Sequence, residues 1–405
     1  MQISILCKVV DNFGDIGVVY RLAKQLKKIN PKNTINLIVD NLESFNKICS
    51  AVQCGLEMQE VEELFVYDWN AADFCHKAFS RNDGELMPVI LECFQCGRPD
   101  WMERILFEEK LQRTVHIIMI DYLTAEKYAE DFHCLKSLTR SAKVQKVNFM
   151  PGFTEKTGGL VIDADWLEVP EWKENGPVLV FTYERDWTSL IQGWLSAASR
   201  WGDLPEPSYK SKLLLAQGRG KESFLAAVRN VVESSQRECI ENSFIEELPY
   251  LNQSEWDRVM KSCSALVIRG EESMSRACLS GIPFIWHAYA QSDEYQLVKV
   301  KALLERMKPH FDEADFEIVE KVWLEINSSD ECIASHCMSS VNLSGNDGKK
   351  HSLREAEQLS NSYYDFFASV PRLVSGFQDF ARSLRKNGDL AYNLMTYIEK
   401  LDIMY

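Results

Sequence analysis

The sequence predicts an α/β protein built from two Rossmann-like domains, on the strength of three observations. Short apolar runs alternate with amphipathic helical stretches, this alternation pauses once and restarts, and 405 residues exceed what one ordinary core accommodates. Alternating strands and helices indicate mostly parallel, doubly wound sheets. We predict an N-terminal domain at 1–150, a linker at 151–177, a second domain at 178–365 and a helical tail at 366–405 that packs back on the first domain.

The first half contributes five predicted strands. Residues 2–10 (QISILCKVV) are continuously apolar enough for a buried strand, and an amphipathic helix follows until Pro31. The apolar face of that helix consists of Val18, Leu22, Leu26 and Ile29. The remaining strands are expected at 34–40, 64–69, 87–94 and 115–123, with helical stretches between them.

The second half repeats the pattern after a pause. Residues 150–177 are dominated by glycine, proline and charge, which indicates a connection between domains. Strands are then expected at 177–184, 212–218, 242–251, 265–270 and 283–289, and helices at 186–200, 222–235 and about 273–280. Residues 327–352 are polar and predict a surface loop. The tail is predicted to be helical because apolar residues recur there at helical spacing, at Leu373, Phe377, Phe380 and Leu384.

Composition excludes several classes of protein. A formal net charge of −15 argues against a nucleic-acid-binding surface, and no apolar run is long enough to cross a bilayer. The start of the chain lacks the basic region of a signal peptide, and its twelve cysteines are scattered. We therefore expect reduced thiols, a cytoplasmic location, and neither a nucleic-acid nor a membrane partner.

The loop after the first strand carries two carboxylates, in the sequence Asp11-Asn12-Phe13-Gly14-Asp15. It offers Gly-x-x-Gly instead of the Gly-x-Gly-x-x-Gly fingerprint, which argues against a dinucleotide-dependent dehydrogenase. One aspartate at a helix start is commonly a cap. Because there are two, we predict that one caps while the other points into a cleft, where it can act as a base.

The loop at 265–297 predicts an anion site. A strand ends before Arg269-Gly270-Glu271-Glu272-Ser273, and a helix opens there. Backbone N–H groups at such a helix start, with Ser273 as N-cap, can hold a diphosphate, and Arg269 adds a cation. The alternative is a capped helix in which Glu271 and Glu272 interact favourably with the helix dipole.

Further positions are candidates for a nucleotide base. Phe181 and Tyr183 end the first strand of the second domain, where their rings either stack on a base or simply pack. Pro249, Leu251 and Gln253 lie where backbone and amide groups would read a base.

Three metal-like features are interpreted as structural. Cys93 and Cys96 have ligand spacing but no second pair follows, so they are expected to be half-buried thiols. Asp163 and Asp165 form an Asp-x-Asp pair in the linker and are taken as solvated charge. His287 lies in an apolar run and is expected to be a core or cleft-wall residue. No metal site is predicted.

Two similar Rossmann-like halves suit the GT-B glycosyltransferase fold, in which both domains face a central cleft. Three stretches then resemble the protein-arginine rhamnosyltransferases that modify bacterial elongation factor P: DNFGDIGVVYRLAKQL, FMPGFTEKTGGL and IRGEESMSRACLSGIPFIWHAYAQSDEYQLVK. This resemblance implies inverting transfer of L-rhamnose from dTDP-β-L-rhamnose to one arginine of elongation factor P, with no metal or other cofactor.

The resemblance also implies roles for individual residues. Asp11 and Asp15 match the paired aspartates, with Asp15 as general base, and Glu271 matches an essential glutamate. Residues at the donor-binding positions are Phe181, Tyr183, Leu251, Gln253, Arg269, Glu272, Ser273, Tyr289, Asn12, Phe13 and Gly14. The chain departs from the family at Glu272, where aspartate is common, and at Met274, where an aromatic residue is usual.

The proposed chemistry suits these residue types. A guanidinium, with a pKa of about 12.5 to 13.8, is a poor nucleophile unless a carboxylate orients it and takes a proton. The N-terminal domain carries the aspartates and is expected to bind the protein acceptor. Two alternatives stay open: a GT-B transferase with another nucleotide sugar or acceptor, and a noncatalytic nucleotide-binding partner of the translation machinery. The division of roles among Asp11, Asp15 and Glu271 also stays open.

Overall fold

The computed structural model describes residues 1–10, 14–80, 88–111, 113–200, 212–234, 244–328 and 361–402. The chain forms two compact units. Unit 1 comprises Met1–Val169, Leu251–Trp256 and Arg382–Tyr405, and unit 2 comprises Pro170–Tyr250 and Asp257–Ala381. The predicted residues Asp11, Asn12 and Phe13, and most of the predicted loop at 327–352, lie outside the described ranges.

The described part of unit 1 contains an eight-stranded sheet in the order β3-β4-β2-β1-β5-β6-β8-β7. Its strands are β1 (Gln2–Cys7), β2 (Thr34–Val39), β3 (Met58–Val61), β4 (Leu64–Asp68), β5 (Val89–Cys93), β6 (Val115–Ile120), β7 (Lys136–Ser137) and β8 (Val144–Phe149). Neighbouring strands are parallel except for β3 beside β4 and β7 beside β8. The central strands are buried on both faces, as the continuous apolar runs predict.

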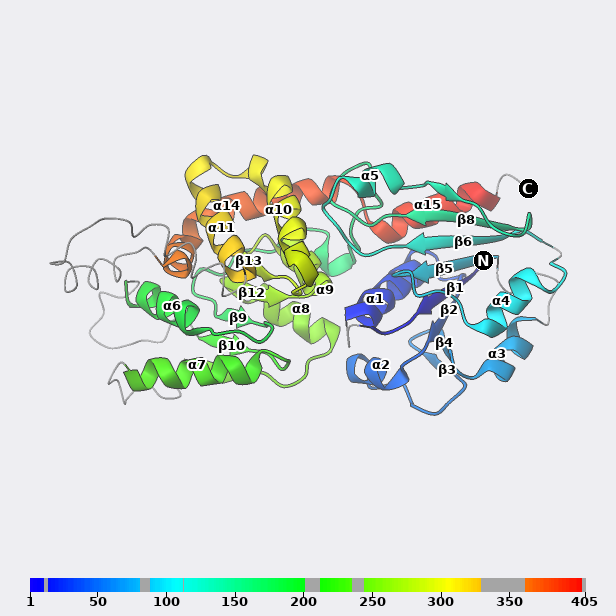
Figure 1. Ribbon diagram of the computed structural model, residues 1–405, viewed down its shortest axis with the longest axis horizontal. Helices are drawn as coiled ribbons and strands as arrows, with labels where there is room; N and C mark the ends of the chain where they lie inside the picture. Colours follow the sequence, from blue (N-terminus) through cyan, green and yellow to red (C-terminus); the bar gives the residue numbers. More distant parts are fainter. Residues whose placement is uncertain are drawn as a thin grey trace. The chain divides into compact units, whose positions relative to one another are not determined.

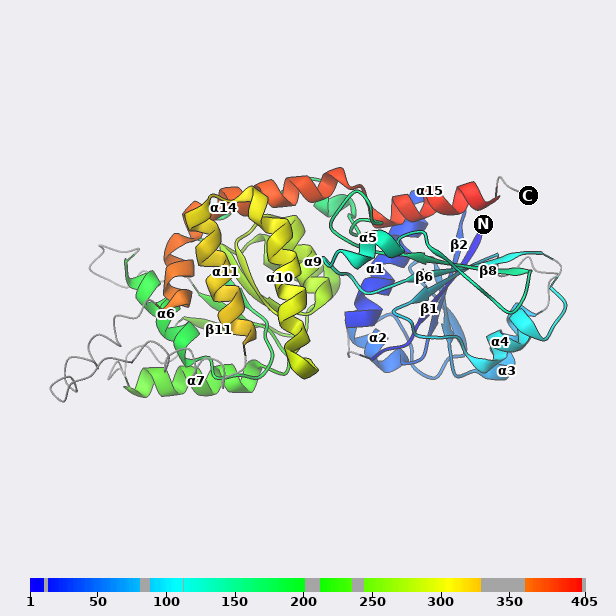
Figure 2. The ribbon, with the colours of Figure 1, turned by 45° about the horizontal axis from the view of Figure 1, so that its top comes forward.

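Helices cover both faces of this sheet (Figures 1 and 2). The helices are α1 (Gly14–Ile29), α2 (Leu42–Ile48), α3 (Ala72–Phe79), α4 (Asp100–Phe107) and α5 (Tyr128–Phe132), followed by a short 3₁₀ turn, η1 (Ala164–Trp166). One core contains α1 and α2, and the other contains α3 and α4. The buried face of α1 is wider than predicted: Ile16, Val19 and Ala23 are buried, whereas Val18 is only partly buried.

The first strand is shorter than the apolar run suggests. Its ladder ends at Cys7, and the backbone N–H groups of Val9 and Val10 donate instead to Asp40 Oδ1 and Asp15 Oδ2, both at 2.8 Å. Side-chain carboxylates therefore replace strand partners at the carboxyl end of β1. Asp15 belongs to this arrangement.

The C-terminal tail consists of α14 (Ser362–Lys386) and α15 (Leu390–Asp402). The four predicted core residues of α14 are buried: Leu373, Phe377, Phe380 and Leu384. The helix α15 packs into the α1 core of unit 1 through Leu390, Leu394 and Ile398. Asp389 anchors its start by accepting hydrogen bonds from the Ile162 N–H at 2.8 Å and from Gln25 Nε2 at 3.3 Å.

The described part of unit 2 contains a five-stranded parallel sheet in the order β11-β10-β9-β12-β13. Its strands are β9 (Val178–Val180), β10 (Leu213–Leu215), β11 (Ile245–Glu247), β12 (Ala265–Arg269) and β13 (Phe284–His287). The helices are α6 (Thr188–Arg200), α7 (Lys221–Ser234), α8 (Gln253–Lys261), whose first residues belong to unit 1, α9 (Glu271–Ser280), α10 (Tyr295–Met307) and α11 (Glu313–Asn327). In both views the pair α6 and α7 and the pair α10 and α11 lie on different sides of this sheet (Figures 1 and 2).

Three strands of unit 1 were not predicted: β3, the two-residue strand β7, and β8. The β3–β4 hairpin turns at Glu62 and Glu63, which lack the usual asparagine or glycine although both have positive φ, 49° and 63°. The strand β8 mixes apolar residues with Gln145, Lys146 and Asn148 without strict alternation, so its sequence shows no clear strand pattern. Across the described residues, no helix combines the length and the apolar character needed to span a membrane.

Candidate functional site

The strand order locates the place in unit 2 where a ligand is expected. The chain moves outward from β9 to β10 and β11, and then returns to the other side of β9 with β12 and β13. In open α/β sheets, ligands bind beyond the carboxyl ends of the strands at this reversal, which here lies between β9 and β12. Phe181 and Tyr183 follow β9, and Arg269 ends β12.

Arg269 is held between two aromatic rings at this point. Its guanidinium carbon lies 4.3 Å from the ring centroid of Phe181 and 4.6 Å from that of Tyr183. The residue is only 8% exposed, and within the described residues its buried Nε has no hydrogen-bond partner. A buried charged donor without an acceptor is costly, so this nitrogen is poised for an anionic ligand.

The helix α9 begins directly after Arg269. Gly270 is its N-cap, with a φ of 75° that favours glycine, and no side chain caps the helix at this residue. The prediction that Ser273 is the N-cap is wrong: the helix starts two residues earlier, and Ser273 is buried in its first turn. The first turn also contains Glu271 and Glu272.

Glu271 is tied to a neighbouring helix. Its Oε1 lies 3.4 Å from Nζ of Lys299 on α10, and the two side chains are 24% and 26% exposed. The sequence analysis did not identify Lys299. The two residues are 28 positions apart, and no local pattern links them.

An aromatic cluster supports the Tyr183 side of the site. The ring of Tyr183 contacts the rings of His287 and Tyr289 edge to face, with centroids 5.3 and 5.4 Å apart, and Trp187 also contacts His287. Tyr289 remains 53% exposed. Thr182 lies between the two stacking residues. Its hydroxyl oxygen is buried without a partner among the described residues, and no sequence signal marked it.

His287 is buried, as predicted for a core or cleft-wall residue. Burial, reinforced by the charges of Arg185 and Arg269, lowers the pKa of His287 to about 3. Its Nδ1 accepts the backbone N–H of Tyr183 at 3.3 Å, which leaves the ring proton on Nε2. His287 therefore fixes the loop that carries the stacking rings.

In unit 1 the strand order reverses between β1 and β5, so the loop after β1 occupies the equivalent position. Gly14 and Asp15 open α1 there. Asp15 is buried and uses Oδ2 to accept the N–H of Val10. The hydrogen bond from the Val10 N–H holds this carboxylate at the carboxyl end of β1.

Leu251 and Gln253 belong to unit 1, although the strands on either side of them belong to unit 2. Gln253 Nε2 donates to the carbonyl of Gly17 on α1 at 2.7 Å, while its buried Oε1 has no partner among the described residues. Asn252 and Glu255 form a reciprocal capping box at the start of α8. The amide oxygen of Gln253 is therefore the group left for a ligand.

The metal-like features have structural surroundings. The prediction of two half-buried thiols is confirmed for Cys96, whereas Cys93 is fully buried. Burial raises the pKa of both thiols, that of Cys96 to about 12. The prediction that Asp163 is solvated charge is wrong: Asp163 pairs with the buried Arg21 at 2.9 Å and caps η1. In the described ranges, no three His, Cys, Asp or Glu side chains come together as metal ligands would.

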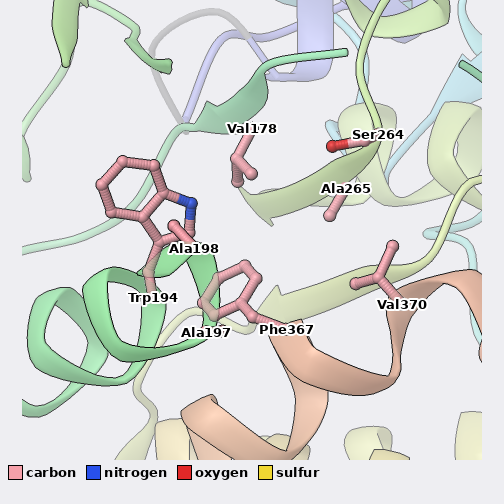
Figure 3. A pocket seen from close by; sticks show the side chains of 8 residues that line it. All are labelled: Val178, Trp194, Ala197, Ala198, Ser264, Ala265, Phe367 and Val370. Atoms are coloured by element: carbon pink, nitrogen blue, oxygen red, sulfur yellow. The ribbon is translucent and has the colours of Figure 1, made fainter. Parts of the chain in front are cut away.

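A shallow apolar hollow also lies in unit 2 (Figure 3). Val178 and Ala265 begin β9 and β12, so the hollow lies at the amino ends of strands whose carboxyl ends carry the site. Its lining residues are Val178, Trp194, Ala197, Ala198, Ser264, Ala265, Phe367 and Val370. It is therefore separate from Arg269 and α9.

Comparison with known proteins shows the family of this chain. Residues 3–399 match the family described as "Elongation-Factor P (EF-P) rhamnosyltransferase EarP". A protein-arginine rhamnosyltransferase of Shewanella oneidensis is 30% identical over 330 residues, which are 74% of this chain and 79% of the relative. One from Pseudomonas aeruginosa is 29% identical over 333 residues, 75% of this chain and 80% of the relative.

A solved structure described as "Structural basis for EarP-mediated arginine glycosylation of translation elongation factor EF-P" aligns with 98% of this chain and 99% of its own. The TM-score is 0.50 and the sequence identity 17%, so this likeness concerns the fold. The predicted GT-B fold class of two Rossmann-like domains is confirmed. Because the family match covers almost the whole chain, this protein belongs to the EarP family of elongation factor P rhamnosyltransferases.

Proposed function

We propose that this protein transfers L-rhamnose from dTDP-β-L-rhamnose to an arginine side chain of elongation factor P, with inversion at the anomeric carbon and without a metal. Membership of the EarP family supports the sugar and the acceptor. The observation that carries the donor site is Arg269, a stacked and buried guanidinium at the carboxyl end of β12 whose Nε has no hydrogen-bond partner among the described residues.

On the donor side, the diphosphate lies at the start of α9. Arg269 donates to one phosphate from Nε, and first-turn backbone N–H groups at Glu272 and Ser273 donate to the other. Phe181, Tyr183 and Tyr289 supply aromatic surface for the nucleotide and sugar. The assignment of Leu251, Gln253, Asn12, Phe13 and Gly14 to the donor stays a prediction.

On the acceptor side, Asp15 is the general base, and Asp11 orients the guanidinium. A guanidinium nitrogen attacks C1 of rhamnose as the bond from C1 to the diphosphate oxygen breaks, and its proton passes to Asp15. The products are rhamnosyl-arginine and dTDP. Glu271 assists from the start of α9. The rigid placement of Asp15 by Val10 supports this role, because a base must lie within hydrogen-bond reach of its proton.

The leaving group gains negative charge in this step. Arg269 and the positive end of the α9 dipole stabilise that charge, which supports a metal-independent reaction. Because the acceptor is a translation factor, the reaction takes place in the cytoplasm. The modified elongation factor P then rescues ribosomes stalled at polyproline.

Intact-mass spectrometry of elongation factor P tests the proposal. Incubation with the protein and dTDP-β-L-rhamnose, with and without a chelator, should add one deoxyhexose in both cases. Replacement of the acceptor arginine by lysine should abolish the gain. No gain in mass with the wild-type protein, under conditions where dTDP binds, would refute the assigned acceptor or sugar.

Two other functions are distinguished by related measurements. A GT-B transferase with another donor or acceptor would bind a nucleotide other than dTDP more tightly, or hydrolyse it without modifying elongation factor P. A noncatalytic nucleotide-binding partner would keep its biological effect in Asp15→Asn and Glu271→Gln. The proposal requires that effect to be lost in Asp15→Asn.

A further inference from the structure

The loop that follows β5 in unit 1 has an unfavourable backbone conformation. Phe94 and Gln95 come directly after the strand, and both have positive φ, 57° and 52°. Side chains with a Cβ atom rarely adopt this conformation, and a bulky aromatic residue does so least readily. Strained residues persist where surrounding contacts hold them, and they are common at ligand sites. The contacts of this loop therefore indicate which groups it positions.

The next strand holds this loop in place. The backbone N–H of Phe94 donates to the carbonyl of Ile120, the last residue of β6, at 2.7 Å. The ring of Phe94 stacks on the ring of Tyr122, with centroids 4.7 Å apart and planes at 22°. Gln95 Nε2 donates to Asp121 Oδ2 at 3.1 Å. The strained backbone thus places both of its side chains against the two residues that follow β6.

The two residues after β6 combine an aromatic surface with a negative charge. Tyr122 is 36% exposed although its ring is stacked. Asp121 accepts from two neutral donors, the amide of Gln95 and the N–H of Tyr122 at 2.8 Å, and no basic side chain pairs with it in the described part of the chain. A guanidinium stacks on aromatic rings and donates to carboxylates, so this pair suits an arginine side chain.

The pair lies at the same edge of the sheet as the proposed base. The strands β1, β5 and β6 are parallel neighbours, so the loops after them share one edge. Cys96, in the loop after β5, has its Sγ 3.7 Å from the carbonyl oxygen of Leu6 on β1. Burial raises the pKa of the Cys93 thiol, and the negative charge of Asp15 adds to that effect. Asp15 is therefore close to the end of β5, where the strained loop begins.

We infer that Asp121 and Tyr122 form an arginine subsite for the protein acceptor. The acceptor side chain lies on the Tyr122 ring, and its guanidinium donates to Asp121 while Asp15 takes the transferred proton. Phe94 and Gln95 are positioning residues, because they hold the ring and the carboxylate of the subsite. This inference rests on the proposed function, which supplies the arginine and the base, and it adds the groups that recognise the arginine before transfer.

Kinetics of rhamnose transfer to elongation factor P test the arginine subsite. Tyr122→Leu removes the aromatic surface and Asp121→Asn removes the charge, so each should lower kcat/KM for elongation factor P at least about fivefold. Tyr122→Phe keeps the ring and should stay within about twofold of the wild type. Calorimetric titration of the full chain should give dTDP affinities within about twofold of the wild type, because neither residue belongs to the proposed donor site.

Matched controls make the same substitutions elsewhere in unit 1. Tyr128→Leu and Asp131→Asn change exposed residues of α5 and should alter neither transfer nor dTDP affinity. Thermal melts of every variant monitor folding.

Gln95→Gly tests the positioning role. Glycine adopts a φ of 52° without strain, so the variant should melt at or above the wild-type temperature. Its KM for elongation factor P should nevertheless rise about threefold with little change in kcat, because Asp121 loses the amide that orients it. An unchanged KM would show that Gln95 does not position the carboxylate.

The results separate this inference from the proposed reaction. If the wild type transfers rhamnose and folded Tyr122→Leu and Asp121→Asn transfer it equally well, the arginine subsite is wrong and the reaction stands. The subsite is also wrong if Tyr122→Phe is as slow as Tyr122→Leu, or if dTDP affinity falls together with transfer. Absence of transfer by the wild type, under conditions where dTDP binds, would overturn both the reaction and the subsite.

Discussion

Replacing Arg269 separates ligand binding from folding more sharply than any other change at this site. Arg269→Lys keeps a positive charge but loses the planar guanidinium that lies 4.3 Å from the Phe181 ring and 4.6 Å from the Tyr183 ring. It also loses the buried Nε donor, which has no partner among the described residues. A lysine ammonium is a flexible, strongly hydrated point charge and cannot replace this geometry.

The magnitude follows from the donor that is lost. A hydrogen bond to a charged group contributes about 1.5–3 kcal/mol, so dTDP affinity should fall roughly 10- to 150-fold. Folding should respond differently. Within the part of the chain that the structure describes, the Nε makes no hydrogen bond in the free protein, so its removal breaks none there. We therefore expect the free energy of unfolding of Arg269→Lys to lie within about 1 kcal/mol of the wild type.

Calorimetric titration with dTDP measures the affinity, and denaturant unfolding of the same samples measures the free energy of unfolding. Arg258→Lys, which changes an exposed arginine on α8, is the control and should alter neither. A folded Arg269→Lys variant that binds dTDP within about twofold of the wild type would refute the reasoning, because the loss of a charge-assisted donor cannot be that small. A large loss of stability would instead make Arg269 a structural residue.

Three further predictions concern the base, a buried histidine and a strained turn. Asp15→Asn should lower the turnover number for rhamnose transfer at least about 100-fold while dTDP affinity stays within about twofold, as measured by mass spectrometry and calorimetry; weakened dTDP binding would make Asp15 a donor ligand. The pKa of His287 is about 3 in the folded state and about 6.5 in the unfolded state. Between these pH values the unfolded state binds more protons. The contribution of neutral His287 to the unfolding free energy is therefore present above pH 6.5 and is lost as the pH falls toward 3. Between pH 7 and pH 5 the wild type should lose about 2 kcal/mol more unfolding free energy than His287→Gln in denaturant titrations, and equal losses would contradict the buried neutral state. Glu63→Gly should stabilise unit 1 by about 0.5–1 kcal/mol, because φ is 63° there, whereas Glu60→Gly in β3 should destabilise it; a loss of stability in Glu63→Gly would show that the turn is not strained.

The local sequence was sufficient to predict the strands that are buried on both faces and the helices that bury one face along their whole length. The strand run in β1 and the spacing of Leu373, Phe377 and Phe380 were identified correctly, because strands buried on both faces and one-sided helices leave a periodic apolar signal. It was insufficient for β8, whose polar side chains interrupt the signal although the strand lies between β6 and β7. The ends of elements also depend on side chains elsewhere in the chain. The strand β1 ends at Cys7, and the N–H groups of Val9 and Val10 donate to the carboxylates of Asp40 and Asp15 instead of to a neighbouring strand.

The sequence by itself determined the fold class, because strands and helices leave an apolar periodicity, and the family, because three of its stretches resemble those of the family. It also marked the loops after β1 and β12 as candidate sites. Only the tertiary structure decided which side chains these loops meet. Arg21 and Asp163 pair across 142 positions, and Lys299 reaches Glu271 across 28. The same is true of the Arg269 guanidinium, whose stacking on Phe181 requires β9 and β12 to be neighbours in the sheet. Such contacts arise when parallel strands place their carboxyl ends at one edge, and no local pattern in the chain records them.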